Sequence, residues 1–513
     1  MPYPRTYNAA FDMVDAHLEA GRAGKLAFVD ATSKITYGEL SVQTNRMANF
    51  LTSLGLPGES RIALLLPDTI DFPVCFWGAI KAGITPIPLN TLLTAEQYGY
   101  ILADARVKTL IASPALLAAV QPVLKDLRDL KHVVVAGGEA PSYGFSLSTE
   151  LAQHANTFQM VETCADETAF WLYSSGSTGA PKGARHIHTS MMDTARLYGQ
   201  GVLGIREDDV IFSAAKLFFA YGLGNGMSFP MSVGATTILL PERPTPESVF
   251  RILREHQPTI FCGVPTLYTA ILANATCTPD AVSKNLRACI SAGEALPAEI
   301  GKAWKNRFGV DILDGVGSTE MLHIYVSNRP GDIRYGTSGT AVKGYEIKLA
   351  DEKGQTPPAG EVGEMLVRGP TAADGYWNQR EKSRRTFEGE WMRTGDKYTC
   401  SADGYYTYAG RTDDMFKVSG IWVSPFEVES ALIGHADVLE AAIVPAEDSD
   451  GLTKPKAFVV LKDGAKPSAA LEATLKEHVK AAAGPWKYPR WIVFAEALPK
   501  TATGKIQRYK LRD

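Results

Sequence analysis

The stretch Ala169–Gly183 reads AFWLYSSGSTGAPKG, an apolar run that ends in a loop of glycines and hydroxyl residues. The apolar run has the length and composition of a buried β-strand. Glycine lets the backbone turn sharply and approach an anion closely, and successive N–H groups can form an anion-binding nest. Hydroxyl groups and one cation accompany them, at Ser174, Ser175, Ser177, Thr178 and Lys182. The stretch therefore predicts a strand followed by a phosphate-binding loop.

Two other interpretations of this loop are weaker. A Walker A loop has glycine before its lysine and serine or threonine after it, whereas Pro181 and Gly183 occupy those places here. A flexible linker is the second alternative, because glycine and serine are common in turns. Pro181 and the strand in front of the loop favour a built phosphate site over a linker.

On both sides of this stretch, apolar runs alternate with amphipathic ones. Helices are expected at Tyr37–Leu54 and Pro297–Phe308. Further buried strands are expected at Arg61–Leu66, Thr109–Ser113, Thr259–Gly263 and Ala288–Ala292. Such alternation is typical of an α/β fold with largely parallel sheets. From Tyr335 to Tyr408, short strands such as Glu364–Val367 lie between glycine-rich turns, which predicts a smaller β subdomain.

A second domain is expected after the polar segment Gly410–Gly420. Ser424, Pro425 and Glu427 have the spacing of a helix N-cap, a first-turn proline and a capping-box carboxylate. Strands at Glu440–Val444, Ala457–Leu461 and Trp491–Phe494 and a helix at Ala469–Ala482 complete the pattern. We expect a large N-terminal domain over residues 1–412 and a small, mobile α+β domain over residues 413–513.

Composition narrows the class of partner. The chain has 513 residues and a net charge of −4, and this near-balance argues against nucleic acid, which favours basic surfaces. No basic block indicates a membrane surface. Six dispersed cysteines and an N-terminus without an apolar core favour a reduced, cytoplasmic protein.

The segment Phe218–Leu240 carries no charge and is long enough to span a bilayer. Its glycines, together with Asn225 and Pro230, favour buried loop and strand that line a site.

The segment YSSGSTGAPKG (Tyr173–Gly183) resembles the signature of the adenylate-forming superfamily, which comprises acyl-CoA synthetases, adenylation domains of peptide synthetases and firefly-type luciferases. Other family segments follow in the expected order over nearly the whole chain. The resemblance implies ATP, Mg²⁺ and coenzyme A as cofactor and co-substrates. In the loop it implies nucleotide binding by Ser174, Ser175, Gly176, Ser177, Thr178, Gly179 and Lys182.

The resemblance assigns further nucleotide-binding residues. In GVGSTE (Gly315–Glu320), Thr319 corresponds to a phosphate-binding threonine and Glu320 to the Mg²⁺-binding carboxylate, and a hard oxygen ligand suits that ion. In SAGEALP (Ser291–Pro297) and TGD (Thr394–Asp396), the purine and ribose contacts are Gly293, Glu294, Ala295 and Asp396. In GRTDD (Gly410–Asp414), Arg411 is implied to contact the nucleotide and Asp413 to be the hinge. In PKTATGKI (Pro499–Ile506), Lys505 corresponds to the lysine that reaches the carboxylate and the α-phosphate.

The acyl-binding segments narrow the resemblance further. KLFFAYGLGNG (Lys216–Gly226), GSTEMLHIY (Gly317–Tyr325), KVSGIWVSPFE (Lys417–Glu427) and KYPRW (Lys487–Trp491) resemble those of bacterial benzoate- and hydroxybenzoate-CoA ligases, with a lean towards 4-hydroxybenzoate. By position, an aryl pocket is implied at Ala220, Tyr221, Gly317, His323 and Ile324. Such a lining fits a flat apolar ring.

The expected activity is therefore that of an aryl acid–CoA ligase, acting as a monomer or homodimer without nucleic-acid or membrane partners. Three alternatives remain. An adenylating enzyme for another carboxylic acid or for a carrier protein would share these motifs, and an assay with free CoA separates the carrier-protein case. A P-loop kinase or ATPase would release ADP rather than AMP. A non-catalytic nucleotide-binding paralogue is disfavoured because Glu320, Asp396 and Lys505 are all present.

Overall fold

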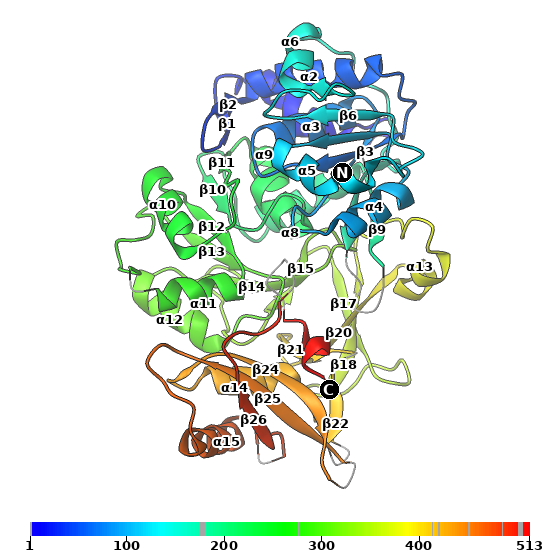
Figure 1. Cartoon of the computed structure of the whole chain (residues 1–513). Coiled ribbons are helices and arrows are strands. Elements are labelled where there is room, and N and C mark those ends of the chain that lie inside the picture. Colours follow the sequence, from blue (N-terminus) through cyan, green and yellow to red (C-terminus); the bar gives the residue numbers. More distant parts are fainter. Residues whose placement is uncertain are drawn as a thin grey trace.

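The computed structural model describes residues 3–174, 180–274, 276–412, 414–418, 421–449, 452–484, 486–500 and 506–512. Within these ranges a large N-terminal domain contains several sheets, and a small α+β domain follows at the C-terminal end (Figure 1). The expected α/β class is confirmed. β21 (Tyr406–Arg411) is the last strand of the large domain. The predicted boundary at residues 412–413 stays a prediction.

The first sheet is fully parallel and lies near the N-terminus. Its order is β4 (Thr85–Pro88), β3 (Arg61–Leu65), β5 (Thr109–Ala112), β6 (His132–Val135) and β7 (Phe145–Ser146). The helices between or beside these strands are α2 (Tyr37–Ser53), α3 (Asp71–Lys81), α4 (Ala95–Asp104), α5 (Pro114–Leu124) and α6 (Leu147–Gln153). Thr36 starts α2 through a capping box with Glu39, which satisfies backbone donors that the helix itself leaves unpaired. The strands expected at Arg61–Leu66 and Thr109–Ser113 are confirmed.

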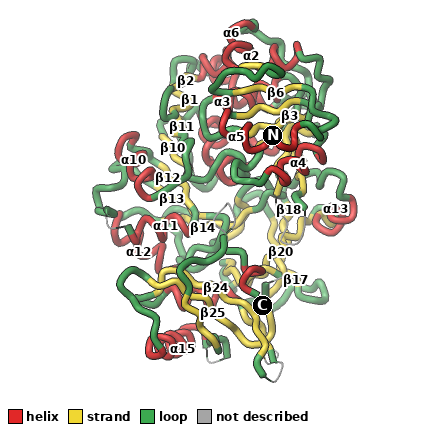
Figure 2. The backbone as a smooth tube through the Cα atoms, in the orientation of Figure 1, coloured by secondary structure: helices red, strands yellow, loops and turns green. Residues whose placement is uncertain are grey.

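A second sheet carries most of the candidate site. Among the described residues its order is β16 (Thr340–Ala341), β15 (Ile324–Ser327), β14 (Ile312–Gly317), β13 (Ala288–Ser291), β12 (Ile260–Gly263), β10 (Val210–Ser213), β11 (Thr236–Ile238), β1 (Leu26–Val29) and β2 (Lys34–Thr36). The strands from β14 to β1 pair in parallel, and the edge strands are antiparallel. α10 (Pro246–His256), α11 (Pro265–Ala273) and α12 (Ala298–Phe308) lie on its outer side (Figure 2).

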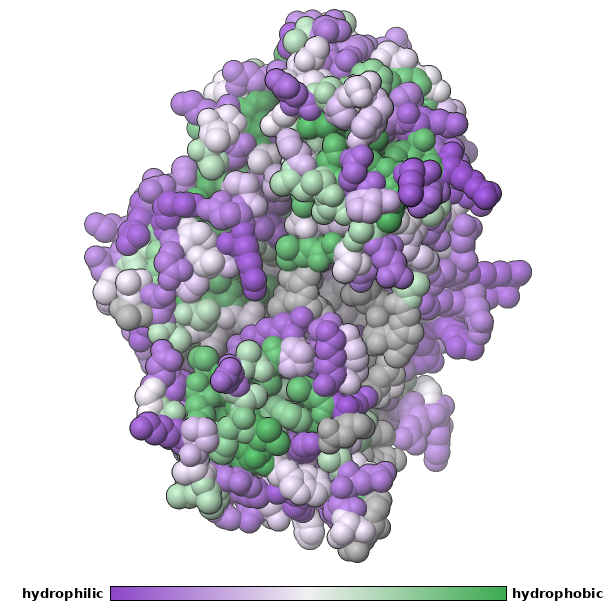
Figure 3. All heavy atoms as spheres, in the orientation of Figure 1, coloured by the Kyte–Doolittle hydropathy of each residue, from purple (hydrophilic) through white to green (hydrophobic). Residues whose placement is uncertain are grey.

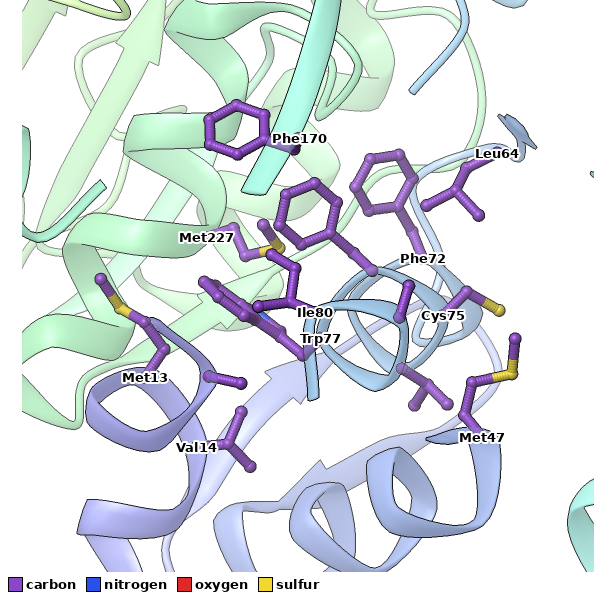
Figure 4. Close-up of a cluster of buried hydrophobic side chains, with 14 of the residues drawn as sticks. Met13, Val14, Met47, Leu64, Phe72, Cys75, Trp77, Ile80, Phe170 and Met227 are labelled. Carbon is purple, nitrogen blue, oxygen red and sulfur yellow. The ribbon is translucent and has the colours of Figure 1, made fainter. Parts of the chain in front are cut away.

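One hydrophobic core joins the N-terminal helices to the segment that follows β10. Trp77 and Phe72 of α3 are fully buried beside Met47 of α2 and Phe170, and Met227 reaches the same cluster (Figure 4). Burying such large apolar side chains supplies about 1.5–3 kcal/mol each. The core therefore fixes residues around 227 relative to the first sheet.

The interpretation of Phe218–Leu240 as loop and strand is wrong for most of the segment. Residues 220–233 are helical, as α8 (Ala220–Leu223), the π-helix η3 (Gly224–Ser228) and α9 (Phe229–Val233), and only β11 is a strand. The glycines mark close packing rather than a loop: a Cβ atom at Gly222 would lie 2.0 Å from the carbonyl oxygen of Lys216. Among the described residues, no helix is long and apolar enough to cross a membrane.

The strand before the phosphate loop stands apart from the parallel sheets. β8 (Thr168–Ser174) pairs antiparallel with β9 (Lys182–Ile187), with Ser174 opposite Lys182. The phosphate loop therefore connects two antiparallel strands. The alternation of apolar and amphipathic runs, which predicted largely parallel sheets, did not predict this pairing.

The expected β subdomain is confirmed as a third sheet in the large domain. β17 (Glu346–Ala350), β18 (Val362–Arg368), β20 (Trp391–Cys400), β19 (Phe387–Glu388) and β21 pair antiparallel. The short helix α13 (Arg380–Thr386) precedes β19.

The small domain has β22 (Phe416–Val418), β23 (Ile421–Val423), α14 (Pro425–Ile433), β24 (Val438–Glu447), β25 (Thr453–Leu461), α15 (Ala469–Ala483), β26 (Trp491–Phe494) and the 3₁₀-helix η4 (Arg508–Leu511). All expected elements are present. Apolar side chains gather on the surface of the small domain, over β24 and β25, in Figure 3. Leu439 of β24 and Phe458 of β25 pack against buried Val460.

One cap differs from expectation. Ser424 accepts a hydrogen bond from the backbone N–H of Glu427, as predicted. The Glu427 carboxylate does not complete a capping box; both of its oxygens accept from Lys487 Nζ at 2.7 Å. An ammonium group is a stronger donor to a carboxylate than a neutral backbone N–H.

Candidate active site

The predicted site residues follow the carboxyl ends of neighbouring parallel strands. Ala220 and Tyr221 come after β10, Gly293–Ala295 after β13, and Gly317–Glu320 at the end of β14. Because these ends meet at one edge of the sheet, they are where α/β proteins bind ligands. Gly293 has φ of +92°, in the left-handed region that glycine favours.

Lys182 and Glu320 meet across this edge. Lys182 Nζ lies 3.0 Å from Glu320 Oε1. The Tyr376 hydroxyl accepts a hydrogen bond from Lys182 Nζ at 2.6 Å and donates one to Glu320 Oε1 at 2.7 Å. Thr319 lies in the turn just before Glu320, where its carbonyl accepts from Leu322 N–H. The predicted phosphate lysine and the predicted metal carboxylate thus form one cluster with a tyrosine.

Opposing effects set the charge of Glu320. Burial alone would raise the pKa of its carboxyl group, but the Lys182 charge and the hydrogen bonds from Tyr376 and Lys182 outweigh burial and lower the pKa. Glu320 is therefore an anion at neutral pH.

This carboxylate suits Mg²⁺, a hard ion that proteins often hold through one or two carboxylates plus substrate phosphates and water. The described residues contain no group of three or more histidine, cysteine or acidic side chains arranged for a metal. Glu320 would thus hold the ion together with the nucleotide, not within an all-protein cage.

The predicted ribose and hinge-side residues pair across two strands. Asp396 of β20 lies opposite Arg411 of β21, and Arg411 Nη1 donates to Asp396 Oδ1 at 2.9 Å. The same nitrogen donates to the carbonyl oxygen of Thr394 at 3.1 Å. Burial raises the pKa of Tyr325, and the charges of Asp396 and Glu320 add to that rise.

Aromatic side chains contact one another at the residues predicted to line an aryl pocket. The Tyr221 hydroxyl lies 3.0 Å from the carbonyl oxygen of Gly263 and 3.1 Å from that of Ile290. His323 Nε2 lies 3.3 Å from the Tyr221 carbonyl oxygen, and the two rings are 5.7 Å apart. Burial lowers the pKa of His323 to about 3, so the imidazole is neutral at physiological pH.

Small residues bring backbone close to these rings. Gly317 lies opposite Ile324, and a Cβ atom at Gly317 would lie 2.5 Å from the His323 carbonyl oxygen. Ala220 is buried at the start of α8. All five predicted lining residues therefore lie in two segments, 220–221 and 317–324, that the Tyr221–His323 contact joins.

The sequence interpretation missed several neighbours of this cluster. Tyr198 and Phe229 lie 5.2 and 4.5 Å from the His323 ring, and a Cβ atom at Gly224 would lie 2.4 Å from His323 Cδ2. Gly224 and Phe229 belong to the stretch that was interpreted as loop and strand. Tyr376 was missed because residues 373–377 are distant in sequence from both Lys182 and Glu320, and no periodic pattern marks them.

Seven predicted residues lie outside the described part of the chain: Ser175, Gly176, Ser177, Thr178, Gly179, Asp413 and Lys505. Their flanks are described. Lys500 and Ile506 form an antiparallel bridge, and the Gln507 N–H donates to the Pro499 carbonyl oxygen at 2.8 Å. The two chain ends on either side of residues 501–505 are thus held together.

Sequence comparisons place the chain among known proteins. The profile of the AMP-binding enzyme family matches residues 16–377, and that of its C-terminal domain matches residues 427–505. A 4-hydroxybenzoate–CoA/benzoate–CoA ligase of Rhodopseudomonas palustris is 55% identical over 99% of this chain and 94% of its own. A benzoate–CoA ligase of Thauera aromatica is 56% identical over 99% of this chain and 96% of its own.

Solved structures agree with the sequence matches. The anthranilate CoA ligase AuaEII, in complex with anthranoyl-AMP, is 44% identical and superimposes with a TM-score of 0.96 over 99% of this chain and 97% of its own. A benzoate CoA ligase from Burkholderia xenovorans gives a TM-score of 0.92 at 49% identity, over 99% of this chain and 100% of its own. Since matches to both profiles and full-length relatives coincide, the chain belongs to the family of AMP-binding enzymes.

Proposed function

We propose that this chain is an aryl acid–CoA ligase that converts a benzoate-like acid, ATP and coenzyme A into the aroyl-CoA thioester, AMP and pyrophosphate. The observation that carries the proposal is that the Lys182–Tyr376–Glu320 cluster and the neutral aromatic cluster around His323 are joined by one short segment, residues 317–324. Names of relatives at 55 and 56% identity support the same activity.

The first step joins acid and nucleotide. A carboxylate oxygen attacks the α-phosphorus of ATP, and the bond from that phosphorus to the departing pyrophosphate breaks. In this proposal Lys182 stabilises the phosphate charge, and Lys505 is the residue assigned to the carboxylate and the α-phosphate. Preorganised cations act strongly where charge develops, because they need no reorganisation during the reaction. Glu320, together with the phosphates, would hold Mg²⁺, which would neutralise part of the phosphate charge.

The second step transfers the acyl group. The CoA sulfur attacks the acyl carbon, AMP leaves with the electrons of the broken carbon–oxygen bond, and the thiol proton passes to solvent. Asp396 and Arg411 hold the ribose side of the nucleotide during both steps. The small domain turns about Asp413 between the steps.

The acid is an arene with few polar substituents. Neutral His323, Tyr221 and the small residues Ala220 and Gly317 offer a flat apolar surface, which suits a ring more than a flexible chain. We favour benzoate and 4-hydroxybenzoate, with a lean towards 4-hydroxybenzoate. The dispersed free cysteines fit a reduced, cytoplasmic enzyme. We expect it to act as a monomer or homodimer.

A panel of acids with CoA and ATP tests this proposal. Benzoate, hydroxybenzoates, aminobenzoates and palmitate are compared by kcat/KM for CoA-dependent AMP formation. Benzoate-like acids should have the highest kcat/KM. Close ring analogues should also react, because one methylene changes the discrimination between substrates by only about 1–3 kcal/mol. Palmitate outcompeting every aromatic acid would contradict an aryl pocket. Adenylate formation without transfer to free CoA would favour the carrier-protein alternative.

A further inference from the structure

The Tyr376 hydroxyl occupies a junction between two opposite charges. It accepts from Lys182 Nζ and donates to Glu320 Oε1, and Lys182 Nζ also lies 4.2 Å from the centroid of the Tyr376 ring. An ammonium group only donates hydrogen bonds and a carboxylate only accepts them, whereas a phenol does both. Tyrosine is therefore chemically matched to a position between lysine and glutamate.

The backbone around Tyr376 is fixed to the phosphate hairpin. Tyr376 forms an antiparallel bridge with Ala184 of β9, and the Trp377 N–H donates to the Gly183 carbonyl oxygen at 2.9 Å. The Arg185 N–H donates to the Gly375 carbonyl oxygen at 3.1 Å. The segment around Tyr376 thus lies along β9, which it meets through this isolated bridge and the flanking backbone hydrogen bonds.

The same segment is tied to the Glu320 turn and to α13. The Ala373 N–H donates to the Glu320 carbonyl oxygen at 2.8 Å. The Ser383 hydroxyl accepts from the Tyr376 N–H at 2.9 Å, and the Tyr376 side chain is only 3% exposed. A side chain fixed by packing and by its neighbours' hydrogen bonds can hold functional groups at a defined spacing.

We propose that Tyr376 is a positioning residue for adenylation: its hydroxyl group sets the distance and orientation of Lys182 relative to Glu320 before the nucleotide binds. This inference rests on the proposed function, in which Lys182 meets the phosphates and Glu320 the metal. Without the hydroxyl, the two charges remain but lose their common partner. Their geometry then varies, and part of the preorganisation that lowers the adenylation barrier is lost.

Tyr376→Phe tests the hydroxyl while keeping the ring and its packing. The matched control is Tyr345→Phe, which removes another buried hydroxyl, 2.9 Å from Thr371 Oγ1, outside the Lys182–Glu320 cluster. We expect Tyr376→Phe to lower kcat for acid-dependent pyrophosphate release about 10-fold, the scale of one lost hydrogen bond to charged groups. KM for the acid and thioester formation from synthetic aroyl-adenylate plus CoA should not change.

A binding measurement separates this inference from the proposed function. Calorimetry with a non-hydrolysable ATP analogue and Mg²⁺, in the absence of acid, should show several-fold weaker binding to Tyr376→Phe than to the parent or to Tyr345→Phe. This result is independent of which acid is the substrate. Equal analogue binding and equal kcat in both variants would overturn the positioning role, as would equal loss of both half-reactions in Tyr376→Phe.

Discussion

At the scale of single residues, the candidate site depends on charges that are partly withdrawn from water. Glu320 stays ionised because Lys182 and Tyr376 compensate the cost of its burial. At His323 the hydrogen bond to the Tyr221 carbonyl oxygen does not offset burial, so the pKa falls and the imidazole is neutral. One part of the site is therefore suited to phosphate and metal, and the adjoining part to an apolar ring.

Lys505→Ala should separate the two half-reactions. Pyrophosphate release with an aromatic acid should slow by roughly 10²–10³-fold, the scale for losing one preorganised donor. Thioester formation from synthetic benzoyl-adenylate and CoA should proceed at nearly the parent rate, because the proposed mechanism uses Lys505 only in the adenylation orientation. Rapid-quench assays of each half-reaction measure both, after circular dichroism has established folding. Equal impairment of both steps would contradict two orientations.

At the scale of elements, sequence reasoning succeeded where patterns are local and strong. The bounds of the strand Trp491–Phe494 and of the helix near Ala469–Ala482 were predicted to within one residue. The apolar periodicity that predicts them lies within each segment. Residues 220–233 were misread because their glycines serve close packing between distant segments. Lys182 and Glu320 were predicted from motifs, whereas Tyr376 acts only through contacts made in the fold.

The β8–β9 hairpin provides a test by pH. His186 of β9 is buried and stacks on Phe170 with ring centroids 5.1 Å apart, and burial lowers its pKa to about 4. Histidine in an unfolded chain titrates near 6.5, so between about pH 6.5 and 4 the unfolded state binds the extra proton. The stability that neutral, buried His186 contributes to the folded state is fully present above pH 6.5. It is lost as pH falls towards 4, which lowers the free energy of unfolding by about 3 kcal/mol at most.

His186→Phe keeps an aromatic ring on Phe170 and removes the titration. Urea unfolding at a series of pH values should show that the free energy of unfolding declines less steeply between pH 6.5 and 4. The change in slope should correspond to the uptake of up to one proton fewer on unfolding. An unchanged slope would mean that His186 takes up its proton in the folded protein.

At the scale of the whole molecule, ion pairs connect Asp414, the residue after the proposed hinge, to the small domain. Arg508 donates to both oxygens of Glu429 on α14, at 3.0 and 2.7 Å, and lies 3.7 Å from Asp414. Arg512 also pairs with Asp414 at 2.6 Å. Asp414, next to Asp413, is thus tied to the small domain, so rotation about Asp413 would move that domain as one body.

Asp413→Pro should therefore block the rotation and not the chemistry of adenylation. Proline fixes φ, so the pivot cannot take up the backbone change. The variant should form aroyl-adenylate at near the parent rate and transfer it to CoA slowly, the reverse of Lys505→Ala. Fast thioester formation by a folded Asp413→Pro enzyme would place the pivot elsewhere.

Adenylation as the chemistry of this site is tested most directly by the product balance of the parent enzyme with 4-hydroxybenzoate or benzoate, ATP, CoA and Mg²⁺. Chromatography of nucleotides, with a coupled pyrophosphate assay, should give AMP, pyrophosphate and aroyl-CoA in equal amounts. No product should form when the acid is omitted. Stoichiometric ADP and orthophosphate would instead contradict adenylation as the chemistry of this site.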